Sequence, residues 1–258
     1  MVSDDPHRLE GATVLVTRPA GTAGSFLRLA RSFGARAIAL PGLSLRAADD
    51  RPRTRPPAAS YDAWIFTSPA AVRFGAGLLP PRRMRSRLQA FAVGDGTARA
   101  LARHGIAAIV PHDRSDSEGL LALAELGKVR GRRIALVGAP GGRDLIGPAL
   151  RRRGARVEAL DVYRREPPRL TRRHFASIEA ADDPLILLVS SGEALAHLVA
   201  RLPASLLDRL RTQPLVVSSA RLVGIARENA FTEIVQARSA APRDLLAAAA
   251  GALGRHRL

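Results

Sequence analysis

Short apolar runs alternate with longer stretches of helical periodicity along most of the chain. The runs cover residues 13–17, 36–40, 63–67, 90–93, 107–110, 133–137, 156–160, 185–190, 215–217 and 233–235. Strands that are apolar on both faces are typical of parallel sheets covered by helices on each side. The pattern therefore predicts a doubly wound α/β fold.

The second half of the chain repeats the first. Residues 14–19 and 134–139 are each a short apolar run ending in small residues, 120 positions apart. Three further pairs of blocks follow in the same order, at offsets of 123, 124 and 125: 64–68 with 187–191, 91–94 with 215–218, and 117–121 with 242–246. An offset that drifts so little indicates a duplicated unit, and so two parallel-sheet lobes.

Small hydroxyl residues and glycines recur where the predicted strands end. The segments are Thr17-Arg18-Pro19, Thr67-Ser68-Pro69, Gly94-Asp95-Gly96-Thr97, Ser117-Glu118-Gly119, Ser190-Ser191-Gly192 and Ser218-Ser219. We expect each to lie at the first turn of the following helix, where Ser and Thr commonly serve as N-caps. Together they also expose backbone amides at helix starts, which bind anions. Ligands of such sheets bind beyond the carboxyl ends of the strands.

The composition is strongly basic. The 258 residues carry 40 basic and 23 acidic side chains, for a net charge of +17, and Lys128 is the only lysine, so 39 of the basic residues are arginine. The length fits two domains. The charge favours a polyanionic partner, but aromatic residues make up only 4% of the chain and show no base-stacking pattern. We therefore favour arginine-rich solvated faces as the explanation of the charge.

Several classes of site are excluded by residue type or spacing. The chain has no cysteine, which excludes disulfides, thiolate metal sites and cysteine nucleophiles. The segment 138–143 is glycine-rich but lacks the spacing of a nucleotide-binding fingerprint. The histidines show no metal-binding spacing. With no secretory signal and no apolar stretch long enough to span a bilayer, we expect a soluble cytoplasmic protein.

Tyr163 is the strongest candidate for proton chemistry. It follows an apolar run, in the segment Asp161-Val162-Tyr163-Arg164-Arg165, where the chain is expected to leave one lobe for the other. The other tyrosine, Tyr61, precedes a strand and fits a core or loop position. Ordinary packing remains an alternative for Tyr163, but a phenol at a domain junction can donate a proton or a hydrogen bond to a ligand.

The chain resembles the uroporphyrinogen-III synthase family of tetrapyrrole biosynthesis from Val14 to about Leu246. The motifs that carry the resemblance are Val16-Thr17-Arg18-Pro19, Phe66-Thr67-Ser68-Pro69-Ala70-Ala71-Val72, Ala92-Val93-Gly94 with Thr97-Ala98, Ser117-Glu118-Gly119-Leu120-Leu121, Val162-Tyr163-Arg164 and Ser190-Ser191-Gly192-Glu193-Ala194-Leu195. The chain departs from the family at Ser218-Ser219, where glycine and threonine are common.

The resemblance implies a fold. It gives two flavodoxin-like lobes that exchange their first βαβ units. One lobe would contain residues 1–40 and 166–258, the other 46–161, and a two-stranded linker of 41–45 and 162–165 would join them.

It also implies an activity. Hydroxymethylbilane, a linear tetrapyrrole with eight carboxylates, would be cyclised and dehydrated to uroporphyrinogen III in a cleft between the lobes. Ring D would be inverted through a spiro intermediate, without a cofactor. The expected enzyme is a monomeric lyase in transient contact with the preceding pathway enzyme, with no nucleic-acid or membrane partner.

Site residues follow from the same resemblance. Tyr163 is expected to be the catalytic donor, and Glu118 a backbone binder at a helix start rather than a general base. The expected substrate-binding residues are Thr17, Arg18, Thr67, Ser68, Pro69, Ala71, Gly94, Thr97, Ser117, Glu118, Gly119, Leu120, Gly138, Arg143, Ser190, Ser191, Ser218 and Ser219. Two alternatives stay open: a non-catalytic tetrapyrrole-sensing or regulatory protein of the same fold, and a basic nucleic-acid-binding protein.

Overall fold

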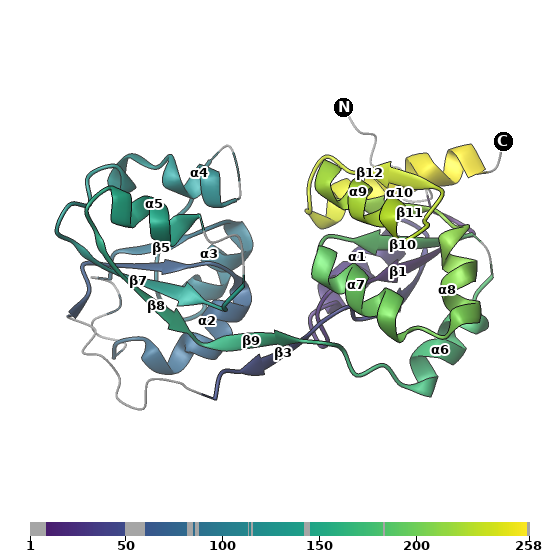
Figure 1. Ribbon diagram of the computed structural model, residues 1–258, viewed down its shortest axis with the longest axis horizontal. Helices are drawn as coiled ribbons and strands as arrows, with labels where there is room; N and C mark the ends of the chain where they lie inside the picture. Colours follow the sequence, from purple (N-terminus) through teal and green to yellow (C-terminus); the bar gives the residue numbers. More distant parts are fainter. Residues whose placement is uncertain are drawn as a thin grey trace. The chain divides into compact units, whose positions relative to one another are not determined.

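The computed structural model describes residues 9–49, 60–81, 85, 88–112, 114, 116–141, 145–182 and 184–256. These residues form two compact units (Figure 1). Unit 1 contains the described residues up to Ser44 and from Glu166 onward, and unit 2 those between Leu45 and Arg165. Unit 1 is therefore built from both ends of the described chain.

Unit 1 is built on a five-stranded parallel sheet in the order β12-β11-β10-β1-β2. Its strands are β1 (Thr13–Val16), β2 (Arg36–Ala39), β10 (Leu185–Val189), β11 (Leu215–Val217) and β12 (Ile234–Gln236). In chain order this is the sequence 2-1-3-4-5 of flavodoxin-like sheets. The doubly wound arrangement predicted from the apolar runs is confirmed for this half of the chain.

Helices cover both faces of the unit 1 sheet. They are α1 (Gly24–Ser32), α6 (Arg172–Glu179), α7 (Gly192–Arg201), α8 (Ala204–Arg211), α9 (Ala220–Glu228) and α10 (Pro242–His256). Alternate residues of β10 point to opposite faces: Leu187 packs in the cluster formed with α6 to α9, and Ile186 in the cluster formed with α1 and α10. The strand is wholly buried because each face has its own core.

Unit 2 repeats this design with the strand order β6-β5-β4-β7-β8, again parallel throughout. Its strands are β4 (Ala63–Phe66), β5 (Ala90–Ala92), β6 (Ala108–Ile109), β7 (Arg133–Gly138) and β8 (Arg156–Asp161). All ten predicted strands are thus present. No bound differs from the prediction by more than one residue.

The helices of unit 2 are shorter. They are α2 (Pro69–Gly75), α3 (Asp95–Ala102), α4 (Ser117–Leu121), α5 (Ile146–Arg152) and the 3-10 turns η2 (Ala76–Leu78) and η4 (Ala124–Leu126). Trp64 and Phe66 of β4 face the core shared with α2 and α3, while Ile65 faces the core shared with α4 and α5. In the described part of either unit, no helix combines the length and apolar character that a membrane span requires.

The two sheets correspond strand by strand through the sequence repeat. β1 and β2 match β7 and β8, yet β1, which carries β2 at its other edge, pairs with β10 of unit 1 rather than with β4, the next sheet strand along the chain. Each unit therefore contains the first βαβ element of one repeat and the remainder of the other, which confirms the predicted exchange.

The chain passes between the units twice, along a two-stranded ladder. The ladder pairs β3 (Ser44–Ala47) with β9 (Tyr163–Glu166). It begins later than the 41–45 segment expected from the family because the chain before it packs in unit 1. The Gly42 amide donates to the Thr17 carbonyl at 3.2 Å, and Leu43 is 5% exposed.

Gly42 packs against helix α7 without room for a side chain. A Cβ atom built on Gly42 would lie 2.5 Å from the Cβ of Ala194 and 2.9 Å from its Cα. We expect Gly42→Ala to lower the free energy of unfolding by about 1–3 kcal/mol, because backbone must shift to relieve the overlap. The control is Gly224→Ala in α9, where the added methyl meets nothing within 4 Å. That substitution should be neutral or stabilising by up to about 1 kcal/mol. Urea unfolding of both variants measures the difference, and equal effects would contradict the packing argument.

Candidate active site

The loops predicted to bind ligand lie at the carboxyl ends of the strands in both units. In unit 1 the strand order reverses between β1 and β10, which brings the loop that begins at Thr17 beside the loop that begins at Ser190. In unit 2 the corresponding reversal, between β4 and β7, brings Thr67 beside Gly138. Ligands of such sheets bind at these reversal points. Each unit thus presents one candidate edge.

Two threonine hydroxyls tie the central strands together at these edges. Thr17 Oγ1 donates to the Leu188 carbonyl at 2.7 Å, and Thr67 Oγ1 donates to the Val137 carbonyl at 3.2 Å. A Cβ on Gly138 would lie 2.7 Å from Thr67 Oγ1, so glycine is required for this close approach. The prediction that Thr17 lies in the first turn of a helix is wrong, because α1 begins only at Gly24.

Serines cap the helices that follow β4 and β10, as predicted. Ser68 Oγ accepts the Ala71 amide at 3.0 Å at the start of α2, and Ser191 Oγ accepts the Ala194 amide at 3.3 Å at the start of α7. Pro69, the first residue of α2, is exposed, while Ser190 is half-buried. Each cap occupies one of the backbone amides that we expected to bind an anionic ligand. Each helix start therefore has one free donor fewer.

Tyr163 lies just past the end of β8, at the carboxyl edge of the unit 2 sheet. Its hydroxyl is 3.1 Å from Ser68 Oγ, with either atom able to donate. Its ring stacks on Phe74 of α2, with centroids 5.6 Å apart and planes at 21°. The residue is 6% exposed and belongs to the unit 2 core. The phenol is therefore held in one orientation by a ring contact and a hydrogen bond.

The loop before α4 is capped by a residue that the sequence analysis missed. Asp116, rather than Ser117, is the N-cap, and its Oδ1 accepts the Gly119 amide at 2.8 Å. The Arg114 guanidinium contacts the carboxylates of Asp116 at 2.8 Å and Glu118 at 2.5 Å. Asp ranks with Ser as an N-cap, so Asp116 was an equal candidate from the sequence.

The pKa of the Asp116 carboxyl lies below its ordinary value. Burial alone would raise this pKa, but the hydrogen bonds from the Gly119 amide and the Arg114 guanidinium outweigh it. The ionised cap therefore contributes stability above the ordinary carboxyl pKa, and this contribution is lost as pH falls through the lowered value.

Three expected binding residues have their side chains in the core. Ala71 and Leu120 are fully buried, and Thr97 is 3% exposed. The Thr97 amide donates to the Gly94 carbonyl at 2.9 Å, where Gly94 is the N-cap of α3. Each of these residues lies in the first turns of its helix, on the side that packs against the sheet. These three side chains are therefore not available to a ligand.

The loop after β11 departs from the capping expected of it. Ser219 occupies the N-cap position of α9, but its side chain makes no capping hydrogen bond. The first turn is closed instead by the Leu222 amide, which donates to the Ser219 carbonyl at 3.0 Å. Ser218 and Ser219 are both half-buried.

Arg18 is a cationic side chain at the unit 1 edge. Its guanidinium donates to the Ala240 carbonyl at 2.7 Å and lies over the Phe26 ring at 5.6 Å. Burial lowers the pKa of Arg18. The second predicted arginine, Arg143, lies outside the described residues. Among the residues that are described, no three His, Asp or Glu side chains are grouped to hold a metal ion.

The contact between Ser68 and Tyr163 can be tested by stability. Ser68→Ala removes the α2 cap, at about 1 kcal/mol, and leaves the buried Tyr163 hydroxyl unpaired, at about 1–3 kcal/mol more. Ser191→Ala, the control, removes only a cap. We therefore expect Ser68→Ala to lower the free energy of unfolding more than Ser191→Ala does. The double variant Ser68→Ala, Tyr163→Phe should lose less stability than the two single variants added together. Additive losses in urea unfolding would show that the two hydroxyls are not coupled.

The chain matches the family model described as uroporphyrinogen-III synthase HemD over residues 25–247. It is 32% identical to uroporphyrinogen-III synthase of Escherichia coli K12 over 236 residues, which are 88% of this chain and 96% of that protein. It is 31% identical to the Salmonella typhimurium LT2 enzyme of the same name over 243 residues, with the same shares covered.

Solved structures show the same fold. Uroporphyrinogen-III synthetase from Helicobacter pylori 26695 superposes with a TM-score of 0.63 at 13% identity, covering 93% of this chain and 99% of that one. A mutant uroporphyrinogen III synthase from the extremely thermophilic bacterium Thermus thermophilus gives 0.56 at 22% identity, covering 95% and 99%. On the family match and these relatives, the chain belongs to the uroporphyrinogen-III synthase family.

Proposed function

We infer that this protein converts hydroxymethylbilane into uroporphyrinogen III, closing the macrocycle with release of water and inversion of the last pyrrole ring. The observation that carries this conclusion is the match to a single enzyme family over residues 25–247. This stretch includes most of the predicted strand-end loops and Tyr163.

The reaction balances without an external reagent. Protonation of the terminal hydroxyl lets water leave and generates an azafulvene. Attack by the substituted carbon of the last pyrrole then gives a spiro intermediate, which rearranges and finally loses a ring proton. Because the bilane also closes without inversion, the main task of the enzyme is to hold the reacting rings in one geometry.

Tyr163 is proposed as the donor to the departing hydroxyl. Ser68 Oγ already accepts the Ala71 amide, so its own hydrogen is available for the Tyr163 oxygen 3.1 Å away. With that bond formed, the phenolic proton is free to point towards a substrate oxygen. Ser68 then acts as a positioning residue, and Phe74 restricts the ring to the same orientation.

Substrate binding is proposed to use the carboxyl edges of both sheets. The eight carboxylates of the substrate need hydrogen-bond donors. The free backbone amides at helix starts supply such donors without adding charged side chains. The caps Ser68, Ser191 and Asp116 take one amide each in their helices. Since fewer amides remain than the sequence suggested, cationic side chains such as Arg18 carry more of the binding in this proposal.

The reactivity of the substrate also bears on how the enzyme works in the cell. We propose a cytoplasmic monomer that receives hydroxymethylbilane through transient contact with the enzyme that makes it. Direct transfer of hydroxymethylbilane between the two enzymes would leave it less time to close in solution without inversion.

The function itself is tested by supplying hydroxymethylbilane to the purified protein and separating isomers I and III of the product. The expected outcome is mainly isomer III. An unchanged fraction of isomer I would refute the assignment.

In the same assay, Tyr163→Phe should lower turnover by roughly ten- to a hundredfold, at or below the lower end of the usual contribution of a general acid, because the substrate is intrinsically reactive, while the product remains isomer III. The phenyl ring keeps the stack on Phe74, so a folded variant is expected, and thermal unfolding checks it. A variant that makes mainly isomer I would show that Tyr163 controls geometry rather than proton transfer.

Arg18→Gln should raise KM by roughly tenfold with a smaller change in kcat, because one charge-assisted contact contributes about 1.5–3 kcal/mol. Arg172→Gln, an exposed substitution in α6, is the matched control and should change neither constant. An unaltered KM in the Arg18 variant would remove Arg18 from the binding site.

A further inference from the structure

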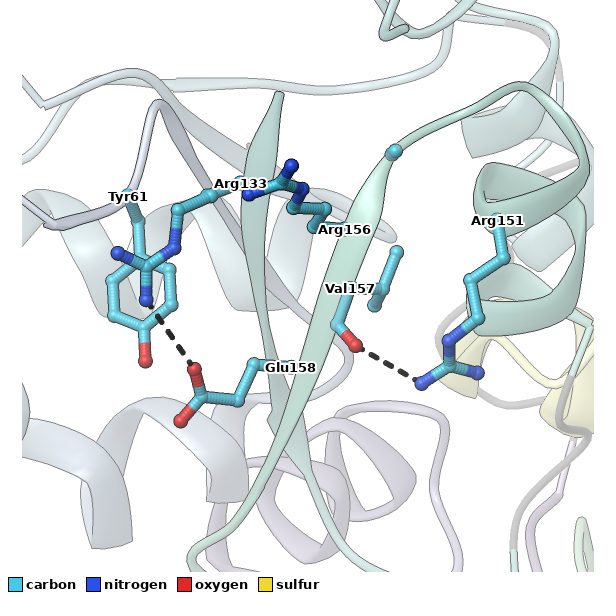
Figure 2. Close-up of a pocket in the computed structure, with 7 residues that line it drawn as sticks. Tyr61, Arg133, Arg151, Arg156, Val157 and Glu158 are labelled. Atoms are coloured by element: carbon cyan, nitrogen blue, oxygen red, sulfur yellow. Dashed lines mark hydrogen bonds and ion pairs between the residues drawn. The ribbon is translucent and has the colours of Figure 1, made fainter. Parts of the chain in front are cut away.

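A pocket of about 390 Å³ opens at the opposite end of the unit 2 sheet from the candidate active site. It is lined by Tyr61, Arg133, Arg151, Ala155, Arg156, Val157 and Glu158 (Figure 2). Arg133 is the first residue of β7, and Gly138 at the active-site edge is the last. Five strand steps of about 3.3 Å separate the two ends by roughly 16 Å. The pocket is therefore no part of the site described above.

Two arginines occupy opposite positions on neighbouring strands at this pocket. Arg133 and Arg156 are register partners in the parallel ladder of β7 and β8. Like charges directly opposite each other destabilise a sheet. Among the described residues, the Arg156 guanidinium has no hydrogen-bond or ion-pair partner, while the one ion pair of Arg133 is a 3.9 Å contact with the half-exposed Glu158. An exposed pair at that distance offsets little of the repulsion.

A third arginine reaches the pocket from helix α5. Arg151 donates to the Val157 carbonyl at 3.0 Å, a contact that Figure 2 draws as a dashed line. This bond fixes the guanidinium beside edge strand β8. Three cations and one carboxylate thus line the pocket.

The pocket also holds a buried phenol. Tyr61 is 7% exposed, and among the described residues its hydroxyl oxygen makes no hydrogen bond. Burial, and secondarily the nearby carboxylate of Glu158, raise the pKa of Tyr61 to about 12, although that carboxylate makes no hydrogen bond of ordinary geometry with the phenol. The Arg133 guanidinium lies over the ring, 5.4 Å from its centroid. Tyr61 is therefore a protonated donor beside the Glu158 carboxylate, with which it forms no hydrogen bond of ordinary geometry.

We propose that this pocket, the Tyr61–Arg156 pocket, binds a small dianion whose paired anionic oxygens belong to a phosphate or to a dicarboxylate. Such a ligand lies between Arg133 and Arg156, relieves their repulsion and accepts the Tyr61 hydroxyl hydrogen. Arg151 adds the third positive charge. Glu158 competes with the ligand for Tyr61 and Arg133, so its carboxylate lowers the affinity of the pocket for an anion.

The competition by Glu158 gives the proposal a signature that a merely structural cluster lacks. Removing a cationic or phenolic partner weakens binding, whereas removing the Glu158 charge strengthens it. A general loss of folding would lower affinity in every variant and could not produce a gain.

The experiment measures binding of inorganic phosphate, and separately of succinate, to the full chain at constant ionic strength. Trp64 is the only tryptophan, and its ring meets that of Tyr61 edge to face with centroids 5.3 Å apart, so its fluorescence reports occupancy. Thermal unfolding gives a second readout, since a ligand of the folded state raises Tm with concentration.

We expect saturable binding of at least one probe to the wild-type chain. Arg156→Gln should weaken it about tenfold and Tyr61→Phe roughly fivefold, while Glu158→Gln should tighten it about threefold. Arg103→Gln, an exposed arginine at the end of α3, is the matched control and should bind like wild type. Preference for phosphate or succinate identifies which dianion is bound.

The proposal fails if neither probe binds saturably, or if Arg103→Gln and Arg156→Gln weaken binding equally, which would show a nonspecific charge effect. It also fails if Glu158→Gln lowers affinity. Isomer III formation by Glu158→Gln without added phosphate or succinate should equal that of wild type. Because binding is read without hydroxymethylbilane, this test is independent of the proposed activity.

Discussion

The parallel pairing of two central strands from distant parts of the chain is the contact on which each unit depends. In unit 1, β1 pairs with β10 through Thr13 to Val16, and in unit 2, β4 pairs with β7 through Ala63 to Phe66. Each pair brings together two loops that diverge to opposite faces of the sheet. The threonine hydroxyls of Thr17 and Thr67 then close the pair at its carboxyl end. The candidate edges therefore exist only once these long-range pairs have formed.

This constraint also fixes what the edges can offer a ligand. Ser68 follows β4 directly, so its cap on α2 and its contact with Tyr163 are set by the same strand. Side chains at this edge are largely committed to one another before a substrate arrives. Such commitment suits a reaction in which geometry selects the product, since preorganised groups lose little entropy on binding.

Much of the fold was predictable because it depends on local pattern and order. The apolar runs located all ten strands of the two sheets, and the repeat indicated two lobes. Details of the site were less accessible. Asp116 and Ser117 are both good caps on local grounds, and only the chain path decides between them. The Ser68–Tyr163 contact joins residues 95 positions apart. The opposition of Arg133 and Arg156 depends on strand register, which apolar runs do not specify.

The arginine excess has a structural explanation that composition alone could not give. Arg209 donates to the carbonyls of Ile178 and Ala181 at the end of α6, and Arg153 to those of Leu121 and Leu126 at the ends of α4 and η4. Carbonyls at helix ends lack partners within the helix, and a guanidinium with five donors can satisfy two of them at once. Lysine carries its three donors on one nitrogen and lacks the planar fork with which Arg209 spans its two carbonyls from two nitrogens. Arginines bound to carbonyls in this way need no polyanion to explain them. Arg156 has no such carbonyl among the described residues and is the register partner of another arginine, which is why an anionic ligand is proposed for its pocket rather than for the basic surface as a whole.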